Sequence, residues 1–191
     1  GRLEGWIEEQ VRGLPAKQRD TDKKRGELRA RFIGEVVKEA AYTWLNRLIV
    51  LRLLEANGHT REEVLTGGWS SGAHQRFRKL ASVLASGDES EGYGVLLGLV
   101  FDELGLSMPG LFGDVGLVKL VPMPPATLRR LVDALNAPEL SSCWGDDTTL
   151  GWVYQYWNDP EREALDARGK ETLKQHSRKA RDRGHDHGMS M

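Results

Sequence analysis

The sequence predicts a mainly α-helical, irregular fold of about six to eight helices with little or no sheet. Leucine occurs 26 times and isoleucine three times, and this imbalance favours helices because strands prefer β-branched residues. Apolar residues at positions 33, 37, 40, 41, 44, 48 and 51 recur every three or four positions, as one helical stripe does. The 22 glycines are spread between segments, where they are typical of helix ends.

The individual elements follow from periodicity and from start and stop signals. The principal helix is expected over residues 27–57, where the apolar stripe runs up to the stop signal Asn57-Gly58. Thr60 and Glu63 have the spacing of a capping box, which predicts a short helix there. Other helices are expected at 2–12, 73–86, 93–104, 125–136, 150–158 and 161–167, with one short strand at 117–121.

The composition changes at residue 168. Residues 168–191 contain seven Lys/Arg, three Asp/Glu and almost no apolar residues, so they carry +4 and residues 1–167 carry −5. A segment that buries no apolar surface does not offset the entropy lost on ordering. We therefore expect one helical domain over residues 1–167 and a disordered basic tail over 168–191.

The composition also limits which cellular compartment and which classes of binding partner are expected for the chain. Charged residues make up 29% of the chain and the mean hydropathy is −0.48, and no apolar run reaches the ~20 residues that span a bilayer. The single cysteine, Cys143, suits a reducing compartment. We expect a cytoplasmic protein with no membrane partner. The net charge of −1 does not by itself indicate a nucleic-acid partner.

Motifs for catalysis and cofactor binding are missing from the sequence. His185 and His187 form an H-x-H with one Asp but lack further ligands on a rigid element. There is no phosphate-binding glycine loop and no G-x-S-x-G elbow. His59 and His74 are expected at the surface or in helix caps. We therefore expect no catalytic, cofactor-binding or metal-binding residue in this chain.

Three stretches, in order, resemble segments of large adenine-specific DNA methyltransferases. The first is Ala40–Gly58, which reads AAYTWLNRLIVLRLLEANG. The second is Met108–Gly113, MPGLFG, and the third is Leu150–Asn158, LGWVYQYWN. Together they resemble the N-terminal region of the PglX family, which belongs to the bacteriophage exclusion (BREX) and phage growth limitation systems.

The resemblance implies a region that precedes an adenine-N6-specific catalytic domain. In the family that domain binds S-adenosylmethionine with a D-P-A-C-G-S-G-like loop and holds the flipped adenine with N-P-P-Y. The near-match here, Met123-Pro124-Pro125-Ala126, lacks both the amide and the aromatic ring. We therefore expect a truncated, non-catalytic helical module that is inactive alone. Its partners would be a methyltransferase core, other phage-defence subunits and, through the full-length family, DNA.

Seven residues in the resembling stretches are candidates for interaction or for structural polar contacts. The polar residues allow two interpretations: a buried network that fixes helix packing, or a contact to DNA or to the missing domain. The aromatic residues of the third stretch form either a docking surface or a base-stacking surface. The candidates are Tyr42, Trp44, Asn46, Arg47, Trp152, Tyr156 and Trp157.

Two further expectations concern charged residues. Arg52 is expected to face outward, away from the apolar stripe of the principal helix. Residues 17–31 contain seven Lys/Arg and three Asp/Glu, which is compatible with a solvated face or with phosphate binding. The alternative function is therefore an autonomous helical module that binds DNA or another protein through this run and the tail.

Overall fold

The computed structural model describes residues 1–87, 89–113, 116–146, 148–153 and 155. In these residues the chain consists of α-helices, 3-10 turns and loops without a strand, which confirms the predicted all-helical class. By its internal contacts the chain divides into two units, Gly1–Gly145 and Asp146–Met191. The expected boundary at residue 167, the helix at 161–167 and the tail lie outside the described residues. Among the helices that are described, none combines the length and the apolar character needed to cross a bilayer.

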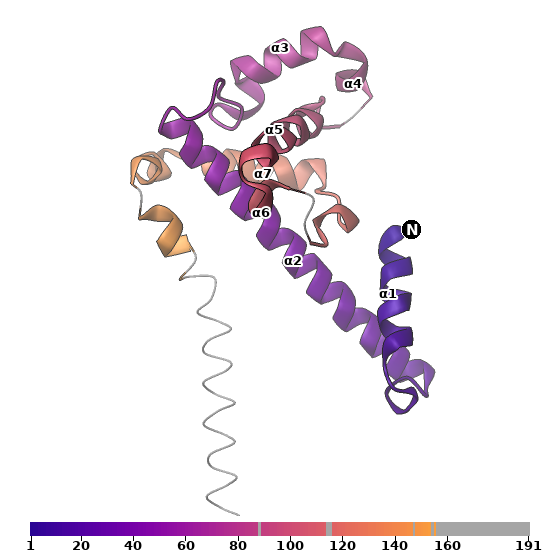
Figure 1. The fold of residues 1–191 in the computed structure, drawn as a ribbon. Helices are drawn as coiled ribbons and strands as arrows, with labels where there is room; N and C mark the ends of the chain where they lie inside the picture. The colour runs from indigo at the N-terminus through magenta and orange to yellow at the C-terminus, as the bar shows by residue number, and fades with distance from the viewer. Residues whose placement is uncertain (88, 114–115, 147, 154, 156–191) are drawn as a thin grey trace, which may run out of the picture. The chain divides into compact units, whose positions relative to one another are not determined.

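The longest element of the first unit is α2 (Asp22–Ala56), which contacts the first helix of the chain and several elements that follow it (Figure 1). Its 35 residues span about 52 Å at 1.5 Å per residue. Thr21 begins it earlier than the periodicity predicts, because the threonine Oγ1 accepts the Lys24 N–H at 3.3 Å as an N-cap. At the other end, Asn57 Nδ2 donates to the Leu53 carbonyl at 2.8 Å.

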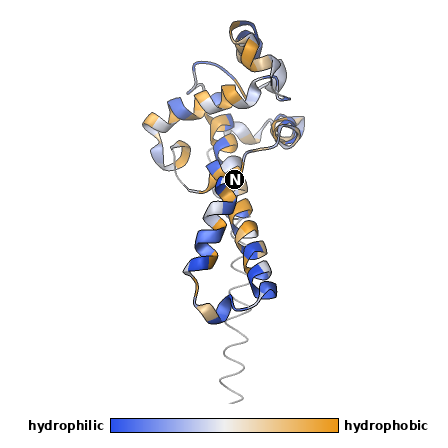
Figure 2. Cartoon of the chain, turned by 90° about the vertical axis from the view of Figure 1, so that its right-hand side faces the viewer, coloured by the Kyte–Doolittle hydropathy of each residue, from blue (hydrophilic) through white to orange (hydrophobic). Residues whose placement is uncertain are grey.

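The first helix, α1 (Arg2–Gly13), runs back along the N-terminal half of α2 (Figure 1). Ile7 and Val11, four residues apart, are buried in this contact. Trp6 meets Phe32 of α2 edge to face, with ring centroids 6.3 Å apart, a favourable aromatic geometry. The turn end of this helical pair is mostly hydrophilic (Figure 2).

The remaining α-helices of the first unit are α3 (Gly72–Leu80), α4 (Ser82–Ser86), α5 (Tyr93–Ser107), α6 (Pro109–Phe112) and α7 (Pro125–Leu135). The 3-10 turns are η1 (Ala16–Gln18), η2 (Gly68–Ser70), η3 (Val118–Leu120), η4 (Pro138–Leu140) and η5 (Cys143–Gly145). Of these elements, α6, α7, η3 and η5 contact α2, whereas α3 packs against α4 and α5, and α5 packs against α6 (Figure 1). The core between them includes Leu48, Leu51, Leu65, Tyr93, Leu97, Phe101, Phe112, Leu128, Val132 and Trp144.

Two expected elements have a different form. The prediction of a strand at 117–121 is wrong. The segment contains η3, in which Leu120 N donates to the Leu117 carbonyl at 2.9 Å. A strand needs a neighbouring strand for its backbone groups, and the described residues offer none. The expected helix at 73–86 is divided into α3 and α4 by Ala81, whose φ of −120° and ψ of 49° are not helical.

The short helix expected at Thr60 is also wrong, because the carboxylate of Glu55 takes up the backbone amides that it would use. Glu55 is only 4% exposed. Its Oε1 accepts the N–H groups of Val64 and Leu65 at 2.7 and 2.8 Å. Its Oε2 accepts both the N–H and the hydroxyl of Thr66 at 2.7 Å. Four charge-assisted hydrogen bonds therefore hold this loop in a non-helical path.

Glu55→Gln is expected to lower the free energy of unfolding by about 2–3 kcal/mol, because the amide NH₂ replaces an oxygen that accepts hydrogen bonds from buried groups. The measurement is urea unfolding followed by circular dichroism. The control is Glu62→Gln, which removes an exposed ion pair with Arg76 and should cost less than about 1 kcal/mol. Equal losses in the two variants would contradict the anchoring role of Glu55.

Candidate functional site

The structure brings together the first two stretches that the sequence singles out. Arg47, from the C-terminal half of α2, is buried, and its Nε donates to the Leu111 carbonyl at 2.8 Å. Its Nη2 donates to the Gly113 carbonyl at 2.7 Å. The last carbonyls of a helix lack intrahelical partners, and a guanidinium offers a rigid fork of donors for them. Arg47 therefore anchors α6 and the residue that follows it to α2.

An aromatic cluster surrounds this anchor. The Arg47 guanidinium carbon lies 5.6 Å from the centroid of the Phe101 ring, within range of a cation–π contact. Phe101 in turn packs against Trp44 at 5.8 Å and against Phe112 at 5.4 Å between ring centroids. Trp44 is half-buried, and its Nε1 is buried without a hydrogen-bond partner in the described part of the chain. Trp44 thus contributes to the packing between α2 and α5.

The other candidate residues are less closely tied to the site. Tyr42 is half-buried, with the Lys38 ammonium 5.4 Å from its ring centroid. Asn46 is half-buried, and its side chain has no hydrogen bond to another described residue. Trp152, in the second unit, is 69% exposed. Tyr156 and Trp157 lie outside the described residues, so the functional roles of the aromatic stretch stay predictions.

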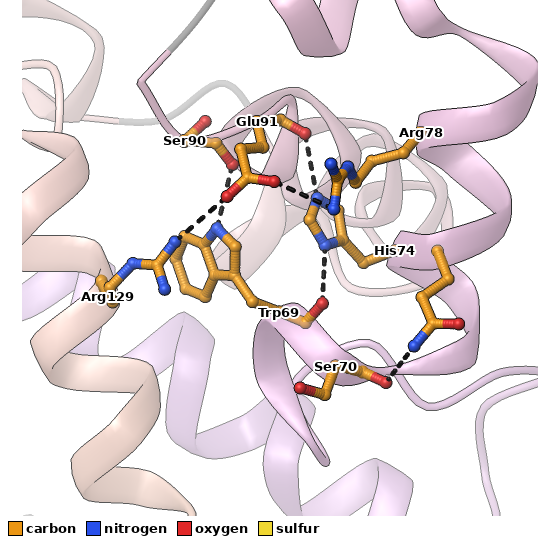
Figure 3. Close-up of polar contacts among 8 residues, drawn as sticks. Trp69, Ser70, His74, Arg78, Ser90, Glu91 and Arg129 are labelled. Carbon is orange, nitrogen blue, oxygen red and sulfur yellow. Dashed lines mark hydrogen bonds and ion pairs between the residues drawn. The ribbon is translucent and has the colours of Figure 1, made fainter.

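Sequence reasoning missed a buried polar cluster around His74, drawn in Figure 3. Of the surface and capping positions expected for this histidine, the surface position is wrong, because its side chain is fully buried. Nδ1 lies 3.0 Å from the Trp69 carbonyl oxygen and Nε2 lies 2.9 Å from the Glu91 carbonyl oxygen. The imidazole edge also meets the Tyr93 ring, with centroids 5.1 Å apart. His74 therefore links α3 to the turns before and after it.

Glu91 extends this cluster to α7 (Figure 3). Its φ of 54° is left-handed, a region that non-glycine residues adopt only under tertiary constraint. Its carboxylate forms ion pairs with Arg78 of α3 at 3.0 Å and Arg129 of α7 at 3.5 Å. The Arg129 guanidinium lies 4.3 Å from the Trp69 ring centroid. The turn before α5 is thus fixed to both neighbouring helices, a link that no local sequence pattern indicates.

Tyr93 connects the cluster to the loop that Glu55 holds. Its ring stacks on Trp69 with centroids 4.0 Å apart, and its hydroxyl donates to the Val64 carbonyl at 2.9 Å. Burial raises the pKa of the Tyr93 hydroxyl, and the carboxylates of Glu55 and Asp133 add to the shift. The hydroxyl therefore stays protonated and remains a donor across the physiological range.

Arg52 does not face outward as expected. The side chain is half-buried, and its guanidinium carbon lies 5.4 Å from the ring centroid of Trp144 in η5. Its Nε is buried without a hydrogen-bond partner among the residues described here. The periodicity of α2 alone missed this contact because Trp144 lies 92 positions later in the sequence and packs back onto the helix.

Arg47→Leu is expected to destabilise the fold by about 3 kcal/mol, because it leaves two carbonyls of the α6 segment without their charged donor. Asn46→Leu is the control and should cost less than about 1 kcal/mol, since leucine is a good helix former. Urea midpoints of the two variants decide the comparison. A larger loss for Asn46→Leu would place the important polar contact at Asn46 instead.

Gly113→Ala is expected to lower stability by about 1–3 kcal/mol through steric overlap. A Cβ at Gly113 would lie 2.3 Å from the backbone oxygen of Pro109, so the backbone would have to shift. Gly110→Ala, within α6, meets nothing within 4 Å and should be neutral or slightly stabilising. Thermal unfolding of both variants is the measurement, and equal melting temperatures would disprove the close approach.

Comparison with known proteins finds a similarity to a methyltransferase. The chain is 23% identical over 160 residues to the adenine-specific methyltransferase PglX of Lacticaseibacillus casei (strain Zhang). The match covers 69% of this chain and 13% of the relative. No family model and no solved structure matches the chain. The chain is thus similar to a short part of a much longer methyltransferase.

Proposed function

We propose that this chain is a non-catalytic helical module of an adenine-N6-specific, S-adenosylmethionine-dependent DNA methyltransferase of a BREX-type phage-defence system. The observation that carries the proposal is the similarity to PglX, limited to 13% of that protein. The Ala40–Gly58 and Met108–Gly113 stretches, which resemble the same family, are the two that Arg47 joins. This contact supports a shared architectural role for them.

The division of labour follows from what the described residues can do. A methyltransferase core needs a strand and loop to hold its cofactor and a polar, aromatic site for the flipped adenine. The described part of this chain is helical, and its buried polar side chains bind backbone groups of the chain itself. We therefore assign the binding of the cofactor and of adenine to a separate methyltransferase core. In this proposal the chain supports that core in the cytoplasm, and the core makes the contacts with DNA.

The alternative, an autonomous DNA-binding module, is less well supported. Five of the seven basic residues in the 17–31 run form ion pairs with carboxylates. These pairs are Lys23–Glu27, Lys24–Asp20, Arg25–Asp22, Arg29–Glu8 and Arg31–Glu35. Because carboxylates neutralise these basic side chains, the hydrophilic end of the α1–α2 pair (Figure 2) is better interpreted as a solvated face than as a phosphate-binding surface.

The purified chain is expected to bind no S-adenosylmethionine and to transfer no methyl group to adenine. Isothermal titration calorimetry measures the first, and incorporation of labelled methyl groups into DNA measures the second. Purified L. casei PglX is the positive control for both assays. Micromolar binding of the cofactor, or methylation by the chain alone, would contradict the non-catalytic assignment.

DNA binding by the isolated chain separates the two functions. For a supporting module we expect only weak binding to a duplex, whereas a phosphate-binding surface gives an affinity that falls steeply with salt. Fluorescence anisotropy at several salt concentrations measures this dependence. Submicromolar binding at 0.15 M salt that Lys23→Glu and Arg25→Glu abolish would favour the autonomous DNA-binding module.

A further inference from the structure

The helix α5 is apolar around almost its whole circumference. Its sequence, YGVLLGLVFDELGLS, contains two charged residues. The buried face consists of Tyr93, Leu97 and Phe101. A helix that is apolar on all sides is typical of positions covered by protein on all sides. In the described part of this chain, however, α5 is covered on one side only.

The exposed side of α5 forms one continuous stripe. Val95, Leu99, Asp102 and Leu106 are spaced by four, three and four residues, so they share one face of the helix. Leu99 is 55% exposed and Leu106 is 86% exposed. Exposed leucines in isolation are ordinary, but a stripe of them along a helix is typical of a protein-binding surface.

A groove adjoins this stripe. Leu96, Val100 and Leu104, the neighbours of the stripe residues along the next face of α5, form one wall. Val64 and Ala73 contribute the other apolar side chains, and residues 59–62 with Glu103 and Ser107 contribute polar ones. The groove encloses about 390 Å³. This volume accommodates a few side chains of a helix that lies along the stripe, as in the docking of an amphipathic helix into a groove.

The charges next to the stripe indicate the chemistry of what covers it. Asp102 and Glu103 are exposed, and neither forms an ion pair with any residue that the structure describes. Arg61, which is also exposed, lines the groove together with Glu103, so the negative charge on the stripe itself comes from Asp102. A second copy of the chain packed α5 against α5 would bring carboxylates toward carboxylates, which is unfavourable. An apolar helix with Lys or Arg near its end complements the stripe instead.

We propose that the α5 face, defined as Val95, Leu99, Asp102 and Leu106 with the adjoining groove, docks an apolar, basic-ended helix of the methyltransferase core. The inference rests on the proposed function and assigns its contact surface. The similarity to 13% of a much longer methyltransferase indicates which partner binds the α5 face, because the rest of a protein of that kind contains many further elements that could pack there.

Site-specific photo-crosslinking tests the surface directly. The full chain, tagged and expressed in its own host, carries p-benzoylphenylalanine at position 106 or, as a control, at exposed position 9 of α1. We expect position 106 alone to crosslink a polypeptide that contains an N-P-P-Y motif, identified by mass spectrometry. Crosslinks from position 106 to a second copy of the chain, or to no protein, would overturn the proposal.

A matched pair of substitutions provides the second readout. Leu106→Asp should reduce the methyltransferase core that co-purifies with the chain at least tenfold. Leu80→Asp, at a leucine that is 87% exposed on α3, should leave it unchanged. Both isolated variants should keep the wild-type melting temperature within about 2 °C, because exposed substitutions rarely affect stability.

The two proposals fail in different ways. If no methyltransferase co-purifies with the wild-type chain, the proposed function is wrong, and the docking surface is wrong with it. If a methyltransferase co-purifies but Leu106→Asp has no more effect than Leu80→Asp, the function stands and the α5 face is not its contact.

Discussion

The buried carboxylate of Glu55 is the interaction on which the C-terminal half of the first unit depends. It fixes the amides of residues 64–66, and the carbonyls of that same loop then serve as acceptors for later segments. Val64 accepts the Tyr93 hydroxyl from α5, and Leu65 accepts Asn136 Nδ2 from the end of α7. Through one loop, therefore, a single side chain of α2 positions two helices that follow much later in the sequence.

Arg47 and Glu55 hold two different segments against the same helix, α2. They lie eight residues apart, close to two helical turns. Their charged groups bind backbone groups of two different segments and not each other. Burying a charge is costly unless hydrogen bonds compensate it. Both compensations come from loop or helix-end amides and carbonyls that would otherwise lack partners. This arrangement turns irregular segments into fixed parts of the fold.

What the sequence predicts well is what local pattern determines. The helices at 2–12 and 125–136 agree closely with α1 and α7 because their apolar spacing and end signals are local. The predictions at Thr60, at 117–121 and at His74 are wrong where residues distant in the sequence determine the local structure. The Glu55 carboxylate binds the loop amides, and the Glu91 carbonyl binds the side chain of His74, 17 positions away. For the candidate site, Arg47 could be singled out, but its partners at Leu111 and Gly113 could not.

The short sequence separation between Glu55 and its loop lowers the entropic cost of this contact relative to the contacts of later segments. The carboxylate and its amide partners are only 9 to 11 residues apart, and loops of about 10 residues close within roughly 10–100 ns. The end of α7, in contrast, reaches the same loop across 71 residues, a closure with a larger entropic cost. The contact between Glu55 and its loop is therefore the closure with the lower cost in chain entropy, and the contact of α7 with the same loop is the one with the higher cost.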